Sequence, residues 1–174
     1  MNKEEGVEPM NEKYGDLDPF RYMVRRLIEI DSPTMIENGS PAHAQILLEE
    51  MFAHAKHTAY VYCGKISNEV WGCEAVAHAV RDAINRPGMQ VRFIVQHPES
   101  IPADSAVRKV LTDHGAVVAT SPRFLNVDHH FAVFDGKMYR FENNDENKTA
   151  TACVNDTTTA GQLTELAQAM LRVA

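Results

Sequence analysis

Side chains that could act as an acid, a base or a nucleophile gather in the stretch NVDHHFAVFDGKMYRFE, residues 126–142. Successive side chains of a strand point to opposite faces, so Asp128 and His130 are expected on one face and His129 on the other. An aspartate beside a histidine gives an oriented imidazole, which is the base half of many acid–base sites. The simpler interpretation is that Asp128 and His130 form a hydrogen-bonded pair in, or at the rim of, a subunit interface.

Three further polar side chains are candidates for contacts with a substrate. Arg140 and Glu142 alternate so as to share one face of the following strand. There they would either bind phosphate and position a reacting group, or lock the two strands together as an ion pair. Asn155 ends a later strand, and its neighbour Asp156 is most simply the N-cap of the closing helix. These residues indicate no cofactor and no metal site.

The elements that must position these residues alternate between strands and helices. Short apolar or β-branched runs predict strands at 58–64, 89–96, 116–119 and 150–156, and helical periodicity predicts helices at 41–57, 68–85, 103–114 and 157–174. The dipeptide Asp135-Gly136 predicts a hairpin within residues 129–142. Because strands first alternate with helices and then pair as a hairpin, the expected fold class is α/β, a mixed β-sheet flanked by helices on both faces.

The chain divides into three segments. Residues 1–16 carry too little apolar surface to pack and are expected to be a disordered tail. Residues 17–40 are expected to be an amphipathic helix followed by a loop, and residues 41–174 a domain. The helix over residues 18–30 has an apolar stripe with three arginines outside it, the stripe being Phe20, Met23, Val24, Leu27 and Ile28. That stripe must pack either on its own domain or on a partner protein.

Composition limits the classes of function. At 174 residues with 44% hydrophobic residues the chain has material for one core, and its net charge of −7 does not indicate a nucleic-acid-binding surface, although a local basic groove stays an alternative. The acidic N-terminus does not resemble a signal peptide, and no apolar run is long enough for a membrane helix, so a cytoplasmic protein without membrane contacts is expected. The cysteines Cys63, Cys73 and Cys153 are expected to be small buried hydrophobes.

The order of elements over residues 41–173, together with the segment FAVFDGK, resembles one half of the phospholipase D superfamily. Its members carry the signature HxKxxxxD on the hairpin and GSxN downstream. The resemblance implies a homodimer that pairs two signature strands across a twofold axis. It also implies phosphodiester cleavage by one histidine nucleophile, a second histidine as acid, and lysines that neutralise the phosphate.

The signature residues themselves depart from that pattern. With Asp135 taken as the signature aspartate, Asp128 stands at the nucleophile position and His130 at the lysine position, while residues 142–145 read ENND where GSxN would fall. In this register the positive charge is missing, and the carboxylate of Asp128 would repel a phosphate. The signature is therefore degenerate.

Two functions follow from these residues. The favoured one is a dimeric binding or assembly module that has lost hydrolysis; because members of the superfamily often act on nucleic acids, in genome defence for example, the resemblance implies an accessory role in such a system. The alternative is a divergent phosphodiesterase or nuclease that uses His130, with His129 as acid and Arg140 as an aid, across a homodimer interface.

Overall fold

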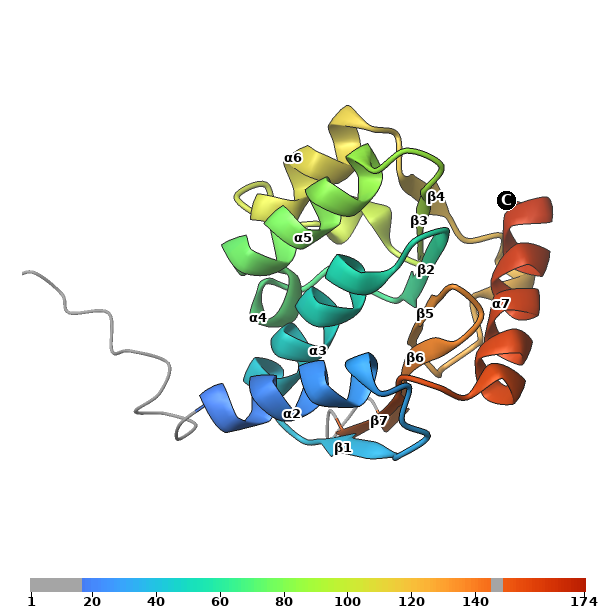
Figure 1. The fold of residues 1–174 in the computed structure, drawn as a ribbon. Helices are drawn as coiled ribbons and strands as arrows, with labels where there is room; N and C mark the ends of the chain where they lie inside the picture. The colour runs from blue at the N-terminus through green and yellow to red at the C-terminus, as the bar shows by residue number, and fades with distance from the viewer. Residues whose placement is uncertain (1–16, 145–148) are drawn as a thin grey trace, which may run out of the picture.

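A computed structural model describes residues 17–144 and 149–174, and seven strands of this part of the chain form one mixed sheet (Figure 1). The strands are β1 (Ile36–Asn38), β2 (Thr58–Cys63), β3 (Gln90–Val95), β4 (Val117–Ala119), β5 (Phe131–Phe134), β6 (Met138–Asn144) and β7 (Thr149–Cys153). Their order across the sheet is β1-β7-β6-β5-β2-β3-β4. β2 pairs in parallel with β3, and β3 with β4, whereas the other neighbouring strands are antiparallel.

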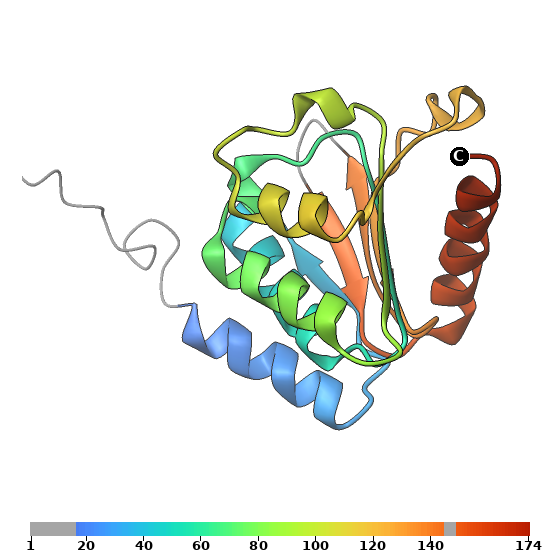
Figure 2. The ribbon, with the colours of Figure 1, turned by 90° about the horizontal axis from the view of Figure 1, so that it is seen from above.

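Helices cover both faces of this sheet. The helices are α2 (Asp18–Glu29), α3 (Pro41–His54), α4 (Asn68–Trp71), α5 (Glu74–Asn85), α6 (Ala106–Asp113) and α7 (Thr157–Arg172), with short 3-10 turns η1 (Pro98–Ser100) and η2 (Pro122–Phe124). Figure 2 shows α2, α3, α5 and α6 on one side of the sheet and α7 on the other. The predicted fold class is therefore confirmed. The expected tail, residues 1–16, lies outside the described residues.

Two apolar clusters fill the space between the sheet and its helices. On the side of α3 and α5, Phe52 stacks on Phe93 and meets Phe134 edge-on, with ring centroids 6.1 and 4.9 Å apart. On the side of α7, Tyr62, Ile94, Phe131 and Met170 are buried against one another. Burial on both faces explains why β2, β3 and β5 read as nearly continuous apolar runs. All three cysteines are free thiols, with Cys63 and Cys153 buried and Cys73 half-buried.

Capping side chains fix the predicted starts of α3 and α7. The hydroxyl of Ser40 accepts from the N–H of His43 at 3.1 Å, and the carboxylate of Asp156 accepts from the N–H of Thr159 at 3.0 Å. The single helix expected over 68–85 is wrong, because the chain breaks at Gly72 into α4 and α5. A β-carbon at position 72 would lie 2.5 Å from the carbonyl oxygen of Asn68, so the turn between the two helices requires glycine.

The hairpin between β5 and β6 forms at the predicted Asp135-Gly136 turn. Asp135 and Gly136 have φ angles of 54° and 62°, the left-handed pair that a type I′ turn requires. The carboxylate of Asp135 also accepts three backbone hydrogen bonds from the start of β2: from Lys56 and His57, both at 2.8 Å, and from Thr58 at 2.9 Å. One side chain thus joins the hairpin turn to the loop between α3 and β2.

The amphipathic helix α2 packs on its own domain. Val24 is fully buried, and Phe20, Leu27 and Ile28 pack partly buried against the main core, so the apolar stripe is used within the chain. Met23, expected in the stripe, is 39% exposed because it lies at the edge of the contact.

The prediction of a loop between the amphipathic helix and residue 41 is partly wrong. Residues 36–38 form β1, which pairs with β7, and Ile36 is buried in the core. A three-residue strand is too short to show an alternating pattern in the sequence.

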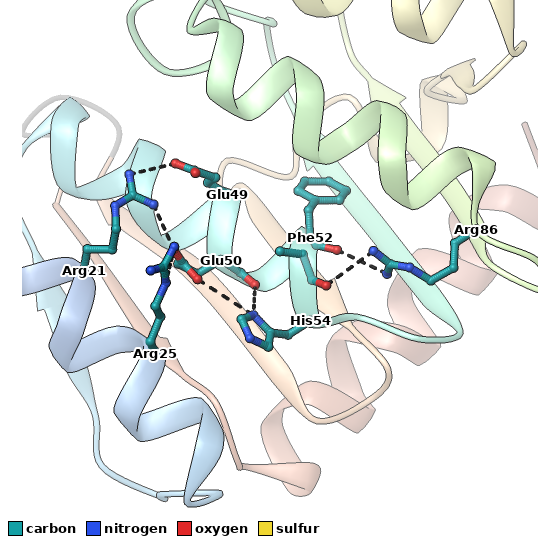
Figure 3. A network of polar contacts seen from close by, with 8 residues as sticks. Arg21, Arg25, Glu49, Glu50, Phe52, His54 and Arg86 are labelled. Carbon is teal, nitrogen blue, oxygen red and sulfur yellow. Dashed lines mark hydrogen bonds and ion pairs between the residues drawn. The ribbon is translucent and has the colours of Figure 1, made fainter.

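Ion pairs reinforce the contact between α2 and α3 (Figure 3). The carboxylate of Glu50 is 2% exposed as a residue and accepts from Arg21 at 2.8 Å and from Arg25 at 2.9 Å. Arg21 also donates to Glu49 at 2.8 Å, and His54 Nδ1 lies 3.9 Å from Glu50 Oε2. The sequence predicts both arginines outside the apolar stripe. In the structure their guanidinium groups pair with the buried carboxylate of Glu50 on α3.

The C-terminal end of α3 is closed by a side chain from the far end of α5. The guanidinium of Arg86 donates to the carbonyl oxygens of Phe52 at 3.4 Å and Ala53 at 3.3 Å, and to that of Ala55. These carbonyls belong to the last turn of a helix, where no intrahelical donor remains. The contact fixes how α3 and α5 lie against each other.

Within the part of the chain that the structure describes, no helix is both long and apolar enough to cross a membrane.

Candidate functional site

A pocket of about 610 Å³ opens at the edge of the sheet where β2 and β3 end and β5 begins. In sheets with parallel strands, ligands bind beyond the carboxyl ends of the strands. The pocket is also bordered by the start of α3, through Ser40, Pro41 and Ala44. Its polar lining includes Gln96, Asp128, His130, Arg140 and Glu142. The hairpin stretch that concentrates histidine and aspartate in the sequence therefore does line a cavity.

Glu142 is the centre of a polar cluster in this pocket. Its Oε2 lies 3.3 Å from His130 Nδ1, and its Oε1 accepts from Arg140 at 2.9 Å. The ion pair predicted between Arg140 and Glu142 is present. The expected pairing of His130 with Asp128 is wrong, because the backbone N–H of Glu142 donates to the carbonyl of His130 and so places these two residues opposite each other across the strands.

Burial and hydrogen bonding act in opposite directions on Glu142. Burial alone would raise the pKa of this carboxyl, but hydrogen bonds from His130 and Arg140, with their charges, outweigh it and lower the pKa from 4.5 to about 2. Glu142 is therefore a carboxylate at any physiological pH. The guanidinium of Arg140, whose residue is only 7% exposed, has its charge compensated inside the protein.

Glu142 should give the fold a specific acid sensitivity. The pKa of Glu142 is lower in the folded chain than in the unfolded chain. Its ionised carboxylate therefore stabilises the fold fully above about pH 4.5, and this stabilisation is lost as the pH falls towards 2. We expect urea denaturation to show a smaller loss of stability between pH 7 and pH 3 in Glu142→Gln than in the unchanged chain. Glu165→Gln, at an exposed position on α7, is the matched control and should keep the full loss. Equal losses in Glu142→Gln and the unchanged chain would contradict this assignment.

Two residues that the sequence analysis missed face His130 across the pocket. Gly64 follows β2 and Gln96 follows β3, and a β-carbon at position 64 would lie 3.0 Å from Gln96 Oε1 and 3.2 Å from His130 Nε2. Only a residue without a side chain lets Gln96 and His130 pack this closely against position 64. The signal that could have found them is their position, because both directly follow the carboxyl ends of neighbouring parallel strands.

Tyr62 and Gln96 hold the segment that precedes His130. The hydroxyl of Tyr62 lies 2.9 Å from the carbonyl oxygen of Phe124 and 3.1 Å from that of Val127, and it accepts from Gln96 Nε2 at 2.7 Å. Burial raises the pKa of Tyr62 to about 12, so this hydroxyl stays protonated. Its ring also meets that of His130 edge-on at 5.9 Å. The side wall of the pocket is thus built by hydrogen bonds from β2 and β3.

Cys63 lines the same pocket as a neutral thiol. Burial raises its pKa to about 12, and the nearby carboxylate of Glu142 acts in the same direction. A nucleophilic cysteine needs the opposite shift. Cys63 therefore contributes packing and no nucleophile.

The remaining predicted site residues are dispersed. Asp128 is exposed and lines the pocket, whereas His129 is exposed and lies against Phe141 with the two rings tilted and their centroids 5.3 Å apart. Phe141 belongs to the α7 side of the sheet, so His129 cannot assist His130 within one chain. Asn155 lies at the opposite end of the sheet, because Cys153 pairs with Tyr139 while Ala150 pairs with Glu142. Its side chain donates to the carbonyl of Asp31 at 2.7 Å, so the structure does not bring Asn155 to the pocket.

No group of three or more His, Cys, Asp or Glu side chains with the geometry to hold a metal ion occurs among residues 17–144 and 149–174.

Comparisons with known proteins agree with this architecture. No family model and no curated protein sequence matches the chain. Among solved structures, a phospholipase D family member, Nuc, from Salmonella typhimurium has a TM-score of 0.58 at 13% identity, covering 82% of this chain and 96% of its own. NucT from Helicobacter pylori has a TM-score of 0.56 at 13% identity, covering 80% of this chain and 98% of its own.

A third similar structure is TrmBL2, described as an archaeal chromatin protein with a novel mode of DNA binding. It has a TM-score of 0.60 at 12% identity; the match covers 94% of this chain but only 62% of TrmBL2. At these identities the similarities concern architecture. They confirm the resemblance drawn from the order of elements, and the chain has a phospholipase D-like fold.

Proposed function

We propose that the chain is a non-hydrolytic, dimeric binding module of phospholipase D-like architecture. One observation carries the proposal: the carboxylate of Glu142 occupies both Arg140 and His130 Nδ1, at 2.9 and 3.3 Å. Phosphoryl transfer depends on cations aimed at the charge that develops on phosphate. Here the buried guanidinium and the imidazole of the pocket face a carboxylate of the same chain.

The charge at the pocket mouth supports the same function. Asp128 stands at the position of the family's nucleophile, exposed and lining the pocket. A carboxylate there repels an approaching phosphodiester, which is itself an anion. The lining thus carries three carboxylates, those of Glu69, Asp128 and Glu142, against the cations Lys65 and Arg140.

Assembly as a homodimer is part of the proposal. The chain carries one copy of the phospholipase D-like unit, and the similar structures Nuc and NucT match it over nearly their full length. The apolar stripe of α2 is used within the chain, so a partner protein would have to bind elsewhere. An accessory role beside a nucleic-acid or defence system fits such a module and stays part of the proposal.

A hydrolytic function is the second candidate, and the geometry of His130 favours it. Glu142 Oε2 lies 3.3 Å from Nδ1 and so orients the ring, as a nucleophilic imidazole would need, and His130 lies in the lining of the pocket. Because His129 lies on the other face of the sheet, the acid would have to come from His130 of a second subunit.

Hydrolysis assays separate the two functions. The full chain should show no turnover of single-stranded DNA, double-stranded DNA or bis(p-nitrophenyl) phosphate, and light scattering should give the mass of a dimer. Turnover that is lost in His130→Ala but kept in His129→Ala would overturn the non-hydrolytic proposal. A monomer at micromolar concentration would remove the dimeric part of it.

A further inference from the structure

The side-chain amide of Asn38, the last residue of β1, has no hydrogen-bond partner in the described part of the chain. The residue is 4% exposed, and neither its Nδ2 nor its Oδ1 makes a hydrogen bond there. Two other asparagines are held: Asn85 Nδ2 donates to the carbonyl oxygen of Arg81 at 3.0 Å, and Asn155 Nδ2 to that of Asp31 at 2.7 Å. The amide of Asn38 therefore lacks the contacts that would keep it away from a neighbouring backbone atom.

Gly39 completes a reactive pair with Asn38. The sequence contains no other Asn-Gly dipeptide. Gly39 is exposed, lies between β1 and the start of α3, and donates no backbone hydrogen bond to any described residue. Glycine has the widest range of backbone conformations and no side chain to obstruct its nitrogen. A bond from this nitrogen to Cγ of Asn38 closes a succinimide ring.

The position of β1 permits the small rearrangement that this ring closure needs. β1 is a three-residue strand at the edge of the sheet and pairs on one side only, with β7 (Figure 1). The pairing ends at Asn38 with Ala150, and Gly39 has no ladder hydrogen bond to break. The ends of such strands open locally far more often than the whole chain unfolds. Each opening frees the backbone of Asn38 to bring Cγ against the nitrogen of Gly39, and it admits water.

We propose that Asn38 is a site of spontaneous deamidation, with Gly39 as the internal nucleophile and water as the co-reactant. Hydroxide removes the proton of the Gly39 N–H, and the nitrogen then attacks Cγ of Asn38. As the N–Cγ bond forms, the Cγ–Nδ2 bond breaks, and Nδ2 takes a proton from water and leaves as ammonia. The product of this step is the succinimide, and the hydroxide is regenerated.

Water then opens the succinimide at either of its C–N bonds. Cleavage of the new N–Cγ bond gives aspartate with the original main chain. Cleavage between the nitrogen and the backbone carbonyl carbon of residue 38 gives isoaspartate, whose main chain runs through Cβ and Cγ. Both products carry a carboxylate in place of the amide.

The new carboxylate should loosen β1. It replaces a buried neutral group, and the preceding residue, Glu37, is also acidic. A negative charge near the start of α3 gains some stabilisation, but less than the burial of an unpaired carboxylate costs. Isoaspartate also lengthens the main chain by one carbon, which disturbs the pairing of β1 with β7. Deamidation is therefore expected to free this edge strand.

Peptide mapping by mass spectrometry tests the proposal on the full chain, incubated at mildly alkaline pH. Asn38 should deamidate at least about tenfold faster than Asn85 and Asn155 in the same sample, because their amides are hydrogen-bonded and bulkier residues follow them. Isoaspartate should accompany aspartate among the products at residue 38.

Two glycine variants test the role of Gly39. Gly39→Ala should slow deamidation of Asn38 at least about tenfold, because a side chain restricts the approach of the attacking nitrogen. A β-carbon at position 39 meets nothing within 4 Å, so this variant should keep the fold. Gly161→Ala, equally open on α7, is the matched control and should leave the rate at Asn38 unchanged.

Hydrogen exchange measures the consequence for the sheet. In Asn38→Asp the amides of β1 and β7 should exchange faster than in the unchanged chain. Asn126→Asp makes the same substitution at an exposed position outside the sheet and should leave their exchange unchanged.

Several results would overturn the assignment of Asn38. They are deamidation no faster than at Asn85, an unchanged rate in Gly39→Ala, aspartate without isoaspartate, and a reaction seen only in the urea-unfolded chain, since the fold would then protect the amide. Unchanged exchange in Asn38→Asp would contradict the loosening of β1. Neither Asn38 nor Gly39 lines the pocket of about 610 Å³, so these results are independent of the proposed binding function.

Discussion

Replacing Asp135 by alanine should lower the free energy of unfolding by about 3 kcal/mol, because three backbone N–H groups lose a charged acceptor and water replaces it only in part. Those groups belong to Lys56, His57 and Thr58, at the entry to the buried strand β2. Alanine would also have to adopt the φ of 54° that Asp135 has in the turn. That conformation costs about 1 kcal/mol for a residue that lacks a short polar side chain.

Urea denaturation with two further variants separates these contributions. Asp135→Asn tolerates a positive φ and keeps one acceptor oxygen, so its loss should be roughly half that of Asp135→Ala. Asp82→Ala, at an exposed position in the middle of α5, should change stability by less than about 0.5 kcal/mol. A loss in Asp135→Ala no larger than in Asp82→Ala would show that the three hydrogen bonds do not hold the hairpin to β2.

Removing the two arginines that face Glu50 should destabilise the chain more than removing the carboxylate itself. In Arg21→Ala/Arg25→Ala the carboxylate, 3% exposed in the unchanged chain, loses its main counter-charges, which should cost about 3 kcal/mol. In Glu50→Gln no buried charge is left. The arginine side chains, 27% and 54% exposed, can turn to solvent, so that loss should be about 1 kcal/mol.

The measurement is again urea denaturation, combined with hydrogen exchange of the amides of α2. Exchange in α2 should become faster in the double variant, since its ion pairs hold the helix to α3. Arg26→Ala removes only an exposed pair with Glu29 and should stay within about 0.5 kcal/mol. If Glu50→Gln costs as much as the double variant, attraction between the groups outweighs the penalty of burying an uncompensated charge.

Local patterns in the sequence were sufficient to predict most of the fold. Periodicity placed the strands and helices, Ser40 and Asp156 gave the helix starts, and Asp135-Gly136 gave the hairpin. These signals act over a few residues, so they need no knowledge of tertiary contacts. β1 and the break at Gly72 were missed because one depends on pairing with β7, and the other on the approach of Asn68 to Gly72.

The partner of His130 could not be predicted because it depends on strand register. The structure pairs Phe134 with Met138, which leaves residues 135–137 between the paired positions and sets Glu142 opposite His130. A hairpin with one residue fewer in its loop would turn Glu142 to the other face of the sheet. The sequence contains every member of the cluster, but the loop length that brings them together follows from packing of the whole sheet.

The pairing of β1 with β7 has a consequence for the order in which the chain can fold. Ile36 pairs with Ala152, and Asp31 contacts Lys137 and Asn155, so residues 31–38 pair with residues more than a hundred positions later in the chain. Closing loops of that length slows folding. During synthesis, residues 31–38 must wait until β7 has left the ribosome, and until then the apolar side chain of Ile36 and the open edge of β1 have no strand to join.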